Sequence, residues 1–134
     1  MSPDDVAQMK AVYDAFNRRD FDRLSSLLDP DVVFIEAEGR GGRTREHRGR
    51  DRLLDYLSSW WDAWETVDWE VYEAREEAGR VLSLCDVRGR PRGTETEVDR
   101  RMGHISRFRD GRLLHSCSYV DVDRAAHDFE AGIG

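Results

Sequence analysis

The chain has 134 residues, a net charge of −7 and 37% charged residues, which is typical of one domain with a polar surface. The acidic balance argues against a general nucleic-acid binder, and no apolar run reaches the roughly 20 residues that a membrane span needs. The acidic, polar start of the sequence is unlike a signal peptide. We therefore expect a cytoplasmic protein that partners neither nucleic acid nor membrane.

The first half of the sequence carries helical signals, with apolar residues at helical spacing and acidic residues ahead of them. The predicted helices are residues 4–18, a short helix between Asp20 and Pro30, and residues 50–65. Residues 32–37 are apolar and β-branched, which predicts a buried strand. Residues 38–50 are rich in Gly and Arg, and we expect them to form a loop.

Only strand signals follow the third predicted helix. The predicted strands are one around residues 69–71, then 81–87, 94–108 and 113–122. Asp110-Gly111 predicts a two-residue hairpin turn, and Gly103 predicts a bulge. A last short helix is expected to begin near Asp123.

Helices first and strands afterwards indicate an α+β fold. Three helices cannot cover both faces of a long twisted sheet. We therefore expect a curved antiparallel sheet that wraps around the three helices and encloses one pocket. Its outer face would then be free to pair with a second copy of the chain.

Several segments together resemble a known family. They are YDAFNRRDFD at 13–22, LLDPDV at 27–32, HRGRD at 47–51, RFRDGRL at 107–113 and SYVD at 118–121. These segments resemble the SnoaL-like branch of the nuclear transport factor 2-like superfamily. The resemblance implies a single domain over residues 1–134, a cone-shaped α+β barrel (the cystatin-like architecture) around an apolar pocket, and a homodimer. That superfamily includes isomerases, polyketide cyclases, dehydratases, epoxide hydrolases and non-catalytic binding modules, so the resemblance leaves the reaction open.

Glu36 and His104 are the candidate catalytic residues. Strand alternation puts Glu36 on the face of Phe34, and alignment with ketosteroid isomerases places it at their general base. An apolar pocket disfavours the charged carboxylate and raises its pKa. The same alignment places His104 at the position of the acid that donates a hydrogen bond to the oxyanion in those enzymes. A histidine can also donate a hydrogen bond there. The alternatives are a Glu36 that points into water and a His104 bonded to a backbone carbonyl.

The sequence departs from the isomerases at their helix tyrosine, which aligns with Val12. Tyr13 is the next residue, but one residue along a helix is a rotation of about 100°. Half of the oxyanion hole is therefore expected to be missing unless Tyr56 supplies it. The last strand carries Ser116 and Ser118 where the epoxide hydrolases and the cyclases would need an acid.

The remaining candidates are residues that would bind a substrate. They are Tyr13, Phe16, Phe34, Tyr56, Trp60, Arg100, Met102, Ser116 and Ser118. The aromatic residues among them could instead simply pack in the hydrophobic core. Arg100 shares the strand face of His104, and inside the pocket it would pair with Glu36.

These residues lead to one function and one alternative. The first is a cofactor-free isomerase, cyclase or dehydratase that acts by acid–base chemistry on an apolar or polycyclic carbonyl compound. The alternative is a non-catalytic ligand-binding or dimeric assembly module on the same fold. His47 and His115 lack partners at metal-ligand spacing, so neither a metal nor a cofactor is expected.

Overall fold

The computed structural model describes residues 4–36 and 44–134, and this part of the chain contains four helices and six strands. The helices are α1 (Asp5–Asn17), α2 (Phe21–Leu27), α3 (Arg50–Ala63) and α4 (Val122–Glu130). The strands are β1 (Leu28–Glu36), β2 (Arg45–Arg48), β3 (Trp64–Glu77), β4 (Arg80–Pro91), β5 (Val98–Arg109) and β6 (Arg112–Tyr119). The predicted α+β class is confirmed.

The strands form one sheet in the order β2-β1-β6-β5-β4-β3. The meander from β3 to β6 is antiparallel, as predicted. β1, however, pairs in parallel with β6 and antiparallel with β2. The sheet is therefore mixed rather than purely antiparallel, because β6, the last strand of the meander, lies beside β1 and runs in the same direction.

The helix boundaries follow from capping. The Asp4 carboxylate accepts the backbone N–H of Val6 at the start of α1, and Asp20 accepts that of Arg23 at the start of α2. Pro30 does not end α2 as expected, because the backbone is already extended at Leu28. Asp110 and Gly111 have φ of 53° and 77°, the left-handed values that the predicted two-residue hairpin turn requires.

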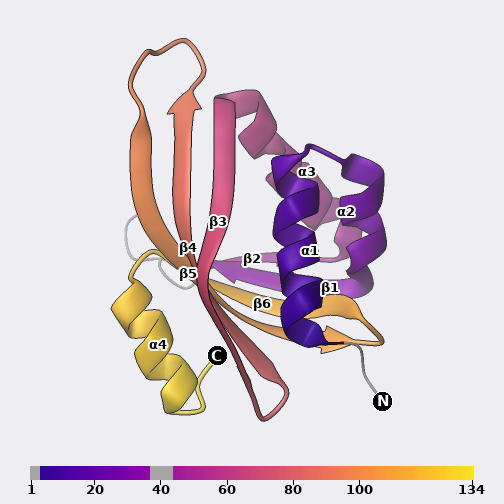
Figure 1. Cartoon of the computed structure of the whole chain (residues 1–134). Helices are drawn as coiled ribbons and strands as arrows, with labels where there is room; N and C mark the ends of the chain where they lie inside the picture. Colours follow the sequence, from indigo (N-terminus) through magenta and orange to yellow (C-terminus); the bar gives the residue numbers. More distant parts are fainter. Residues whose placement is uncertain (1–3, 37–43) are drawn as a thin grey trace.

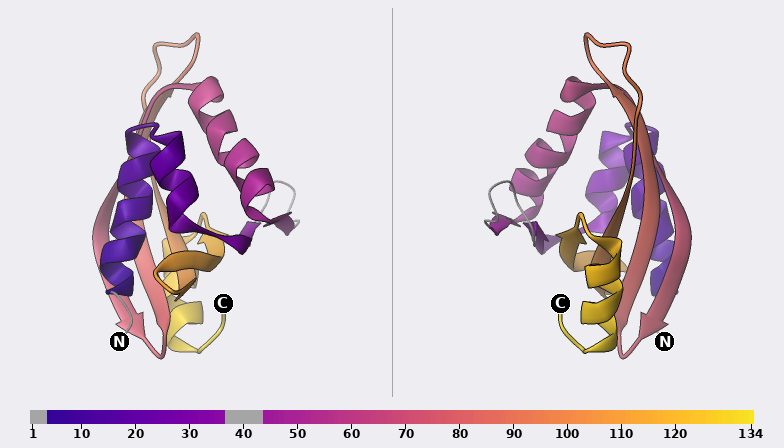
Figure 2. Two further views of the ribbon diagram at one scale, coloured as in Figure 1. Left: turned by 90° about the vertical axis from the view of Figure 1, so that its right-hand side faces the viewer. Right: turned by 90° about the vertical axis from the view of Figure 1, so that its left-hand side faces the viewer.

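The first three helices lie against the concave face of the sheet. Figure 1 shows α1, α2 and α3 on one side of the long strands and α4 on the other. In the side views of Figure 2, α3 diverges from α1 and α2 towards its N-terminal end. The larger hydrophobic core lies between these helices and the sheet, so the helices and the bent strands together surround its centre.

Two local predictions were wrong. Part of the expected loop at 38–50 is strand β2, and the rest of that loop up to residue 43 lies outside the described residues. No bulge occurs at Gly103, where pairing is regular on both sides. An added Cβ there would lie 3.0 Å from Leu84 and 3.1 Å from Ala125. Gly103 therefore makes room for α4.

The outer face of the sheet is partly covered, contrary to the expectation of a free face. The second hydrophobic cluster joins α4 to the sheet through Leu82, Leu84, Ile105, Cys117, Tyr119, Ala125 and Phe129. α4 thus protects the outer side of β4, β5 and β6. None of the helices in residues 4–36 and 44–134 is long and apolar enough to cross a membrane.

Candidate functional site

A cavity of about 100 Å³ lies between α1, α3 and the concave face of the sheet. Most of its walls are aliphatic or aromatic, and a few polar groups interrupt them. Ten of the eleven residues proposed from the sequence line it: Tyr13, Phe16, Phe34, Glu36, Tyr56, Trp60, Met102, His104, Ser116 and Ser118. The curvature of the sheet gathers residues that are more than 100 positions apart in the chain.

Arg100 is the exception and corrects the sequence interpretation. Its side chain is exposed and does not line the cavity. The strand alternation was right, because Arg100 pairs with the buried Val87 on the inner side of the sheet. The pairing of β5 with β6 begins only at Gly103, however. Arg100 therefore projects beyond the closed part of the sheet, and Glu36 has other partners.

The polar residues of the cavity form a row across the sheet. Register places Glu36 beside Ser118, Ser118 beside His104, and His104 beside Ser83. Neighbouring strands lie about 4.8 Å apart, so Glu36 and His104 stand about 10 Å apart at their backbones with Ser118 between them. In the next row, the hydroxyls of Ser106 and Ser116 bond to each other at 2.9 Å.

His104 is bonded to Tyr13 rather than to a backbone carbonyl. The Tyr13 hydroxyl lies 2.6 Å from His104 Nδ1 and 2.7 Å from Ser83 Oγ, and all three side chains are buried. Burial lowers the pKa of His104 to about 4 and raises that of Tyr13 well above its usual value. Both groups are therefore neutral at pH 7 and able to donate hydrogen bonds.

Tyr13 lines the cavity despite its offset of one residue from the position of the isomerases' helix tyrosine. The buried face of α1 is wide, so Val12 and Tyr13 both line the cavity although they are neighbours in the sequence. The one-residue offset turned Tyr13 towards β4 and β5, where it meets His104. Tyr56, the expected substitute, bonds to Glu36 instead.

Glu36 lies at a half-buried part of the cavity and has three neighbours. Tyr56 donates to its Oε1 at 3.0 Å, and His47 Nε2 lies 3.0 Å from its Oε2. Arg45 Nε is 3.7 Å from the same Oε2. Burial is the main reason that the pKa of Tyr56 rises to about 12, so Tyr56 remains a donor.

His47 and Arg45 were missed because they lie in the segment predicted as loop. β2 pairs His47 with Phe34 and Arg45 with Glu36, which brings both side chains to the inner face. The segment Arg-Glu-His-Arg has no apolar residue, so no strand pattern could reveal it. A group of three or more side chains able to hold a metal is absent from the described residues.

One buried donor beside this site is unsatisfied. Trp69 lines the cavity and packs against Tyr13 and His104, with ring centroids 5.7 and 5.4 Å apart. Its Nε1–H has no hydrogen-bond partner among residues 4–36 and 44–134. Such groups are uncommon in proteins and carry a free-energy cost.

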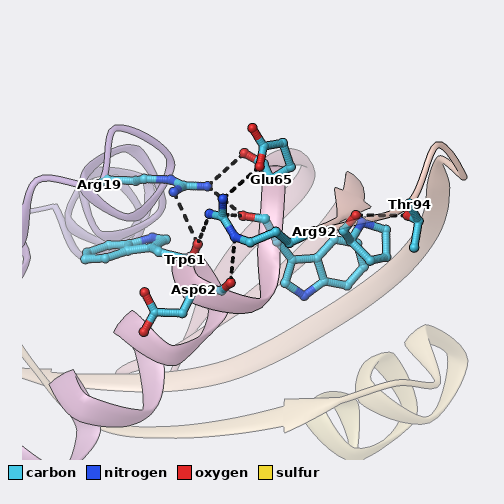
Figure 3. Close-up of polar contacts among 8 residues, drawn as sticks. Arg19, Trp61, Asp62, Glu65, Arg92 and Thr94 are labelled. Atoms are coloured by element: carbon cyan, nitrogen blue, oxygen red, sulfur yellow. Dashed lines mark hydrogen bonds and ion pairs between the residues drawn. The ribbon is translucent and has the colours of Figure 1, made fainter.

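Two arginines anchor the C-terminal end of α3 and so fix the wall of the cavity that α3 provides (Figure 3). Arg19 donates to the carbonyls of Trp61 and Glu65 at 3.2 and 3.1 Å. Arg92 donates to the carbonyl of Asp62 and to the Glu65 carboxylate, both at 2.8 Å. The last carbonyls of a helix lack partners within it, and cations stabilise that end.

Comparison with known proteins shows which structures share this fold. No curated protein matches the sequence. TerC, solved with polyporic acid, has a TM-score of 0.75 at 20% identity over 94% of this chain and 98% of its own. An LEH-like epoxide hydrolase of M. tuberculosis has a TM-score of 0.72 at 17% identity over 96% of both chains. A protein with a ketosteroid isomerase-like fold from Catenulispora acidiphila, in complex with trimethylamine, has a TM-score of 0.74 at 16% identity over 100% of this chain and 96% of its own.

These identities show a shared fold and leave the reaction open. The match that defines the family is in the sequence itself. Residues 9–116 match the model of the SnoaL-like domain, which includes most of α1, the strands β1 to β5 and most of the cavity. The chain belongs to the SnoaL-like domain family.

Proposed function

We propose that the chain is a cofactor-free enzyme that moves a proton in a small apolar carbonyl compound, by isomerisation, cyclisation or dehydration. One observation carries this proposal. The Glu36 carboxylate and the neutral Tyr13–His104 pair line the same apolar cavity, in one row with Ser118 between them. A base and a hydrogen-bond donor on either side of a bound carbonyl compound are what enolisation needs.

The donor side would hold the carbonyl oxygen. When Ser83 donates to Tyr13 and Tyr13 donates to His104 Nδ1, the neutral imidazole carries its proton on Nε2. That nitrogen has no partner among the described residues and is free to donate to a ligand. Preorganised donors act strongly in such a water-poor site, and one is worth roughly 10²–10³ in rate.

The base side would take the proton from the carbon next to the carbonyl. Tyr56 and His47 occupy one hydrogen-bonding position on each oxygen of Glu36. A carboxylate has about four such positions, so Glu36 keeps room to accept a proton. The two partners also hold the carboxylate in a single orientation, which is needed for efficient transfer.

The volume of the cavity limits the substrate. At about 100 Å³ it is below the roughly 300–1,000 Å³ of sites for drug-sized ligands, and near the roughly 150 Å³ that holds one benzene ring. We therefore narrow the expected ligand from apolar or polycyclic to a compound with one ring. A larger ligand would require side chains to move.

A non-catalytic binding module is the second candidate function. The observation that favours it is that Glu36 already has Tyr56, His47 and Arg45 as partners. In that case the three would stabilise a structural carboxylate. A homodimer through the part of the outer face that α4 leaves uncovered belongs to either candidate, and light scattering tests it.

The isomerisation of cyclohex-3-enone to cyclohex-2-enone, followed by its absorbance, tests the enzymatic proposal. This probe has one ring, one carbonyl and an acidic C–H between the carbonyl and the double bond. We expect catalysis by the protein and a fall of about 10²–10⁴-fold in the Glu36→Gln variant. Glu46→Gln is the matched control, because Glu46 lies on the opposite face of β2 and pairs with Arg48. Binding of the ketone without catalysis would favour the binding module.

A further inference from the structure

We infer that Ser118 makes the cavity specific for a carbonyl compound that carries a hydroxyl group on the carbon next to its carbonyl. The inference rests on the proposed function and deepens it, because it names the class of substrate as an α-hydroxy ketone with one ring. It concerns the part of the sheet between Glu36 and His104, where the proposed proton transfer uses no side chain.

Ser118 differs from the other buried serines in having no partner. Ser83 bonds to Tyr13 at 2.7 Å, and Ser106 and Ser116 bond to each other at 2.9 Å. Ser118 is only 7% exposed, yet its hydroxyl makes no hydrogen bond with the described residues. A buried hydroxyl without a partner costs free energy. A ligand that gives this hydroxyl a partner therefore gains affinity.

The Ser118 hydroxyl adjoins the cavity, which Ser118 lines. Among the described residues, the polar side-chain atoms that are completely enclosed and lack a partner are Trp69 Nε1 and His115 Nδ1. Ser118 Oγ is not one of them, so free space lies next to it. A ligand in the cavity can therefore contact this oxygen directly.

The neighbours of Ser118 show which part of a ligand it meets. It lies between Glu36 of β1 and His104 of β5, about 4.8 Å from each at the backbone. A serine side chain is short and stays close to the sheet, whereas glutamate and histidine reach further over the cavity. Ser118 therefore faces the middle of a ligand whose carbonyl oxygen lies at His104 and whose acidic C–H lies at Glu36. This middle includes the carbon next to the carbonyl.

The way His104 is held separates the carbonyl oxygen from Ser118. Tyr13 bonds to His104 Nδ1 at 2.6 Å and also to Ser83 of β4. It thus holds the imidazole on the β4 side, whereas Ser118 belongs to β6 on the other side of β5. An oxygen on the adjacent carbon is better placed to reach Ser118. A hydroxyl suits this place better than an ether oxygen, because the Glu36 carboxylate accepts hydrogen bonds and a serine hydroxyl both donates and accepts.

The test compares the binding of 2-hydroxycyclohexanone and 2-methylcyclohexanone, which differ only in a hydroxyl and a methyl group of similar size. Trp60 and Trp69 line the cavity, so tryptophan fluorescence can follow the binding of each ketone. We expect the wild type to bind the hydroxy ketone more tightly. In Ser118→Ala, this preference (the ratio of the two Kd values) should fall about tenfold, which corresponds to the loss of one hydrogen bond.

Ser106→Ala is the matched control, because it removes a buried hydroxyl from the same face of the sheet at a residue that does not line the cavity. The preference of the wild type should persist in this variant. Equal weakening of both ketones in Ser118→Ala would assign Ser118 to the carbonyl oxygen and overturn the inference. Failure of the wild type to bind the hydroxy ketone would also overturn it. A preference that depends on Ser118 in a protein that does not isomerise cyclohex-3-enone would instead overturn the proposed catalysis and support the ligand class.

Discussion

Replacement of Tyr13 by phenylalanine probes the buried network on which the donor side of the cavity depends. The hydroxyl lies 2.6 Å from His104 Nδ1 and 2.7 Å from Ser83 Oγ. Its loss removes two hydrogen bonds worth about 1 kcal/mol each and leaves a buried nitrogen unpaired, at about 1–3 kcal/mol. His104 is only 5% exposed, so water cannot easily replace the hydroxyl. We expect a loss of about 3–5 kcal/mol from the typical 5–15 kcal/mol of unfolding free energy.

Urea unfolding followed by circular dichroism measures this loss. With a slope of about 2 kcal/mol per molar urea, the midpoint should fall by about 1.5–2.5 M. Tyr72→Phe is the control, because Tyr72 is 40% exposed and its loss should stay within about 0.5 kcal/mol. Equal midpoints for Tyr13→Phe and Tyr72→Phe would refute the reasoning.

Three further predictions concern the hydrogen bonds of Arg92 to the end of α3, the packing of α4 against Gly103 and the charge of His104. Arg92→Ala should lower the unfolding free energy by about 1–2 kcal/mol, measured by urea unfolding, whereas Arg88→Ala, with a single exposed ion pair, should change little. Gly103→Ala should cost about 1–3 kcal/mol, because its Cβ would meet Ala125 at 3.1 Å; an unchanged melting temperature would contradict this. Because burial lowers the pKa of His104 to about 4, the unfolded chain binds its proton first, so the contribution of His104 to stability falls from pH 6.5 to pH 4. NMR titration should find the ring neutral above pH 4, and a protonated ring at pH 6 would contradict the burial argument.

Local signals predicted the elements of the fold well, because they act over a few residues. Asp4 and Asp20 cap their helices, and Asp110-Gly111 makes the turn that its type requires. The pairing of β1 with β6 had no local signal, since Glu36 and Ser118 meet only after the meander is complete. Such pairings depend on the whole chain.

The candidate site was predictable in part for the same reason. Strand alternation placed Glu36 and His104 on the inner face of the sheet, where they line the cavity. Alternation also put Arg100 on that face, but it could not show where the neighbouring strand stops. His47 was out of reach because a polar edge strand carries no hydrophobic pattern.

A crystal structure of the Glu36→Gln variant with cyclohex-2-enone tests most directly whether the cavity holds a carbonyl compound between a base and a hydrogen-bond donor. Residue 36 and the neutral donor should lie on opposite sides of one ligand. We therefore predict the ring inside the cavity, with its carbonyl oxygen within hydrogen-bond distance of His104 Nε2. The ring carbons should then face residue 36. A ketone bound outside the cavity, or one whose carbonyl points away from His104 towards residue 36, would contradict the proposed function.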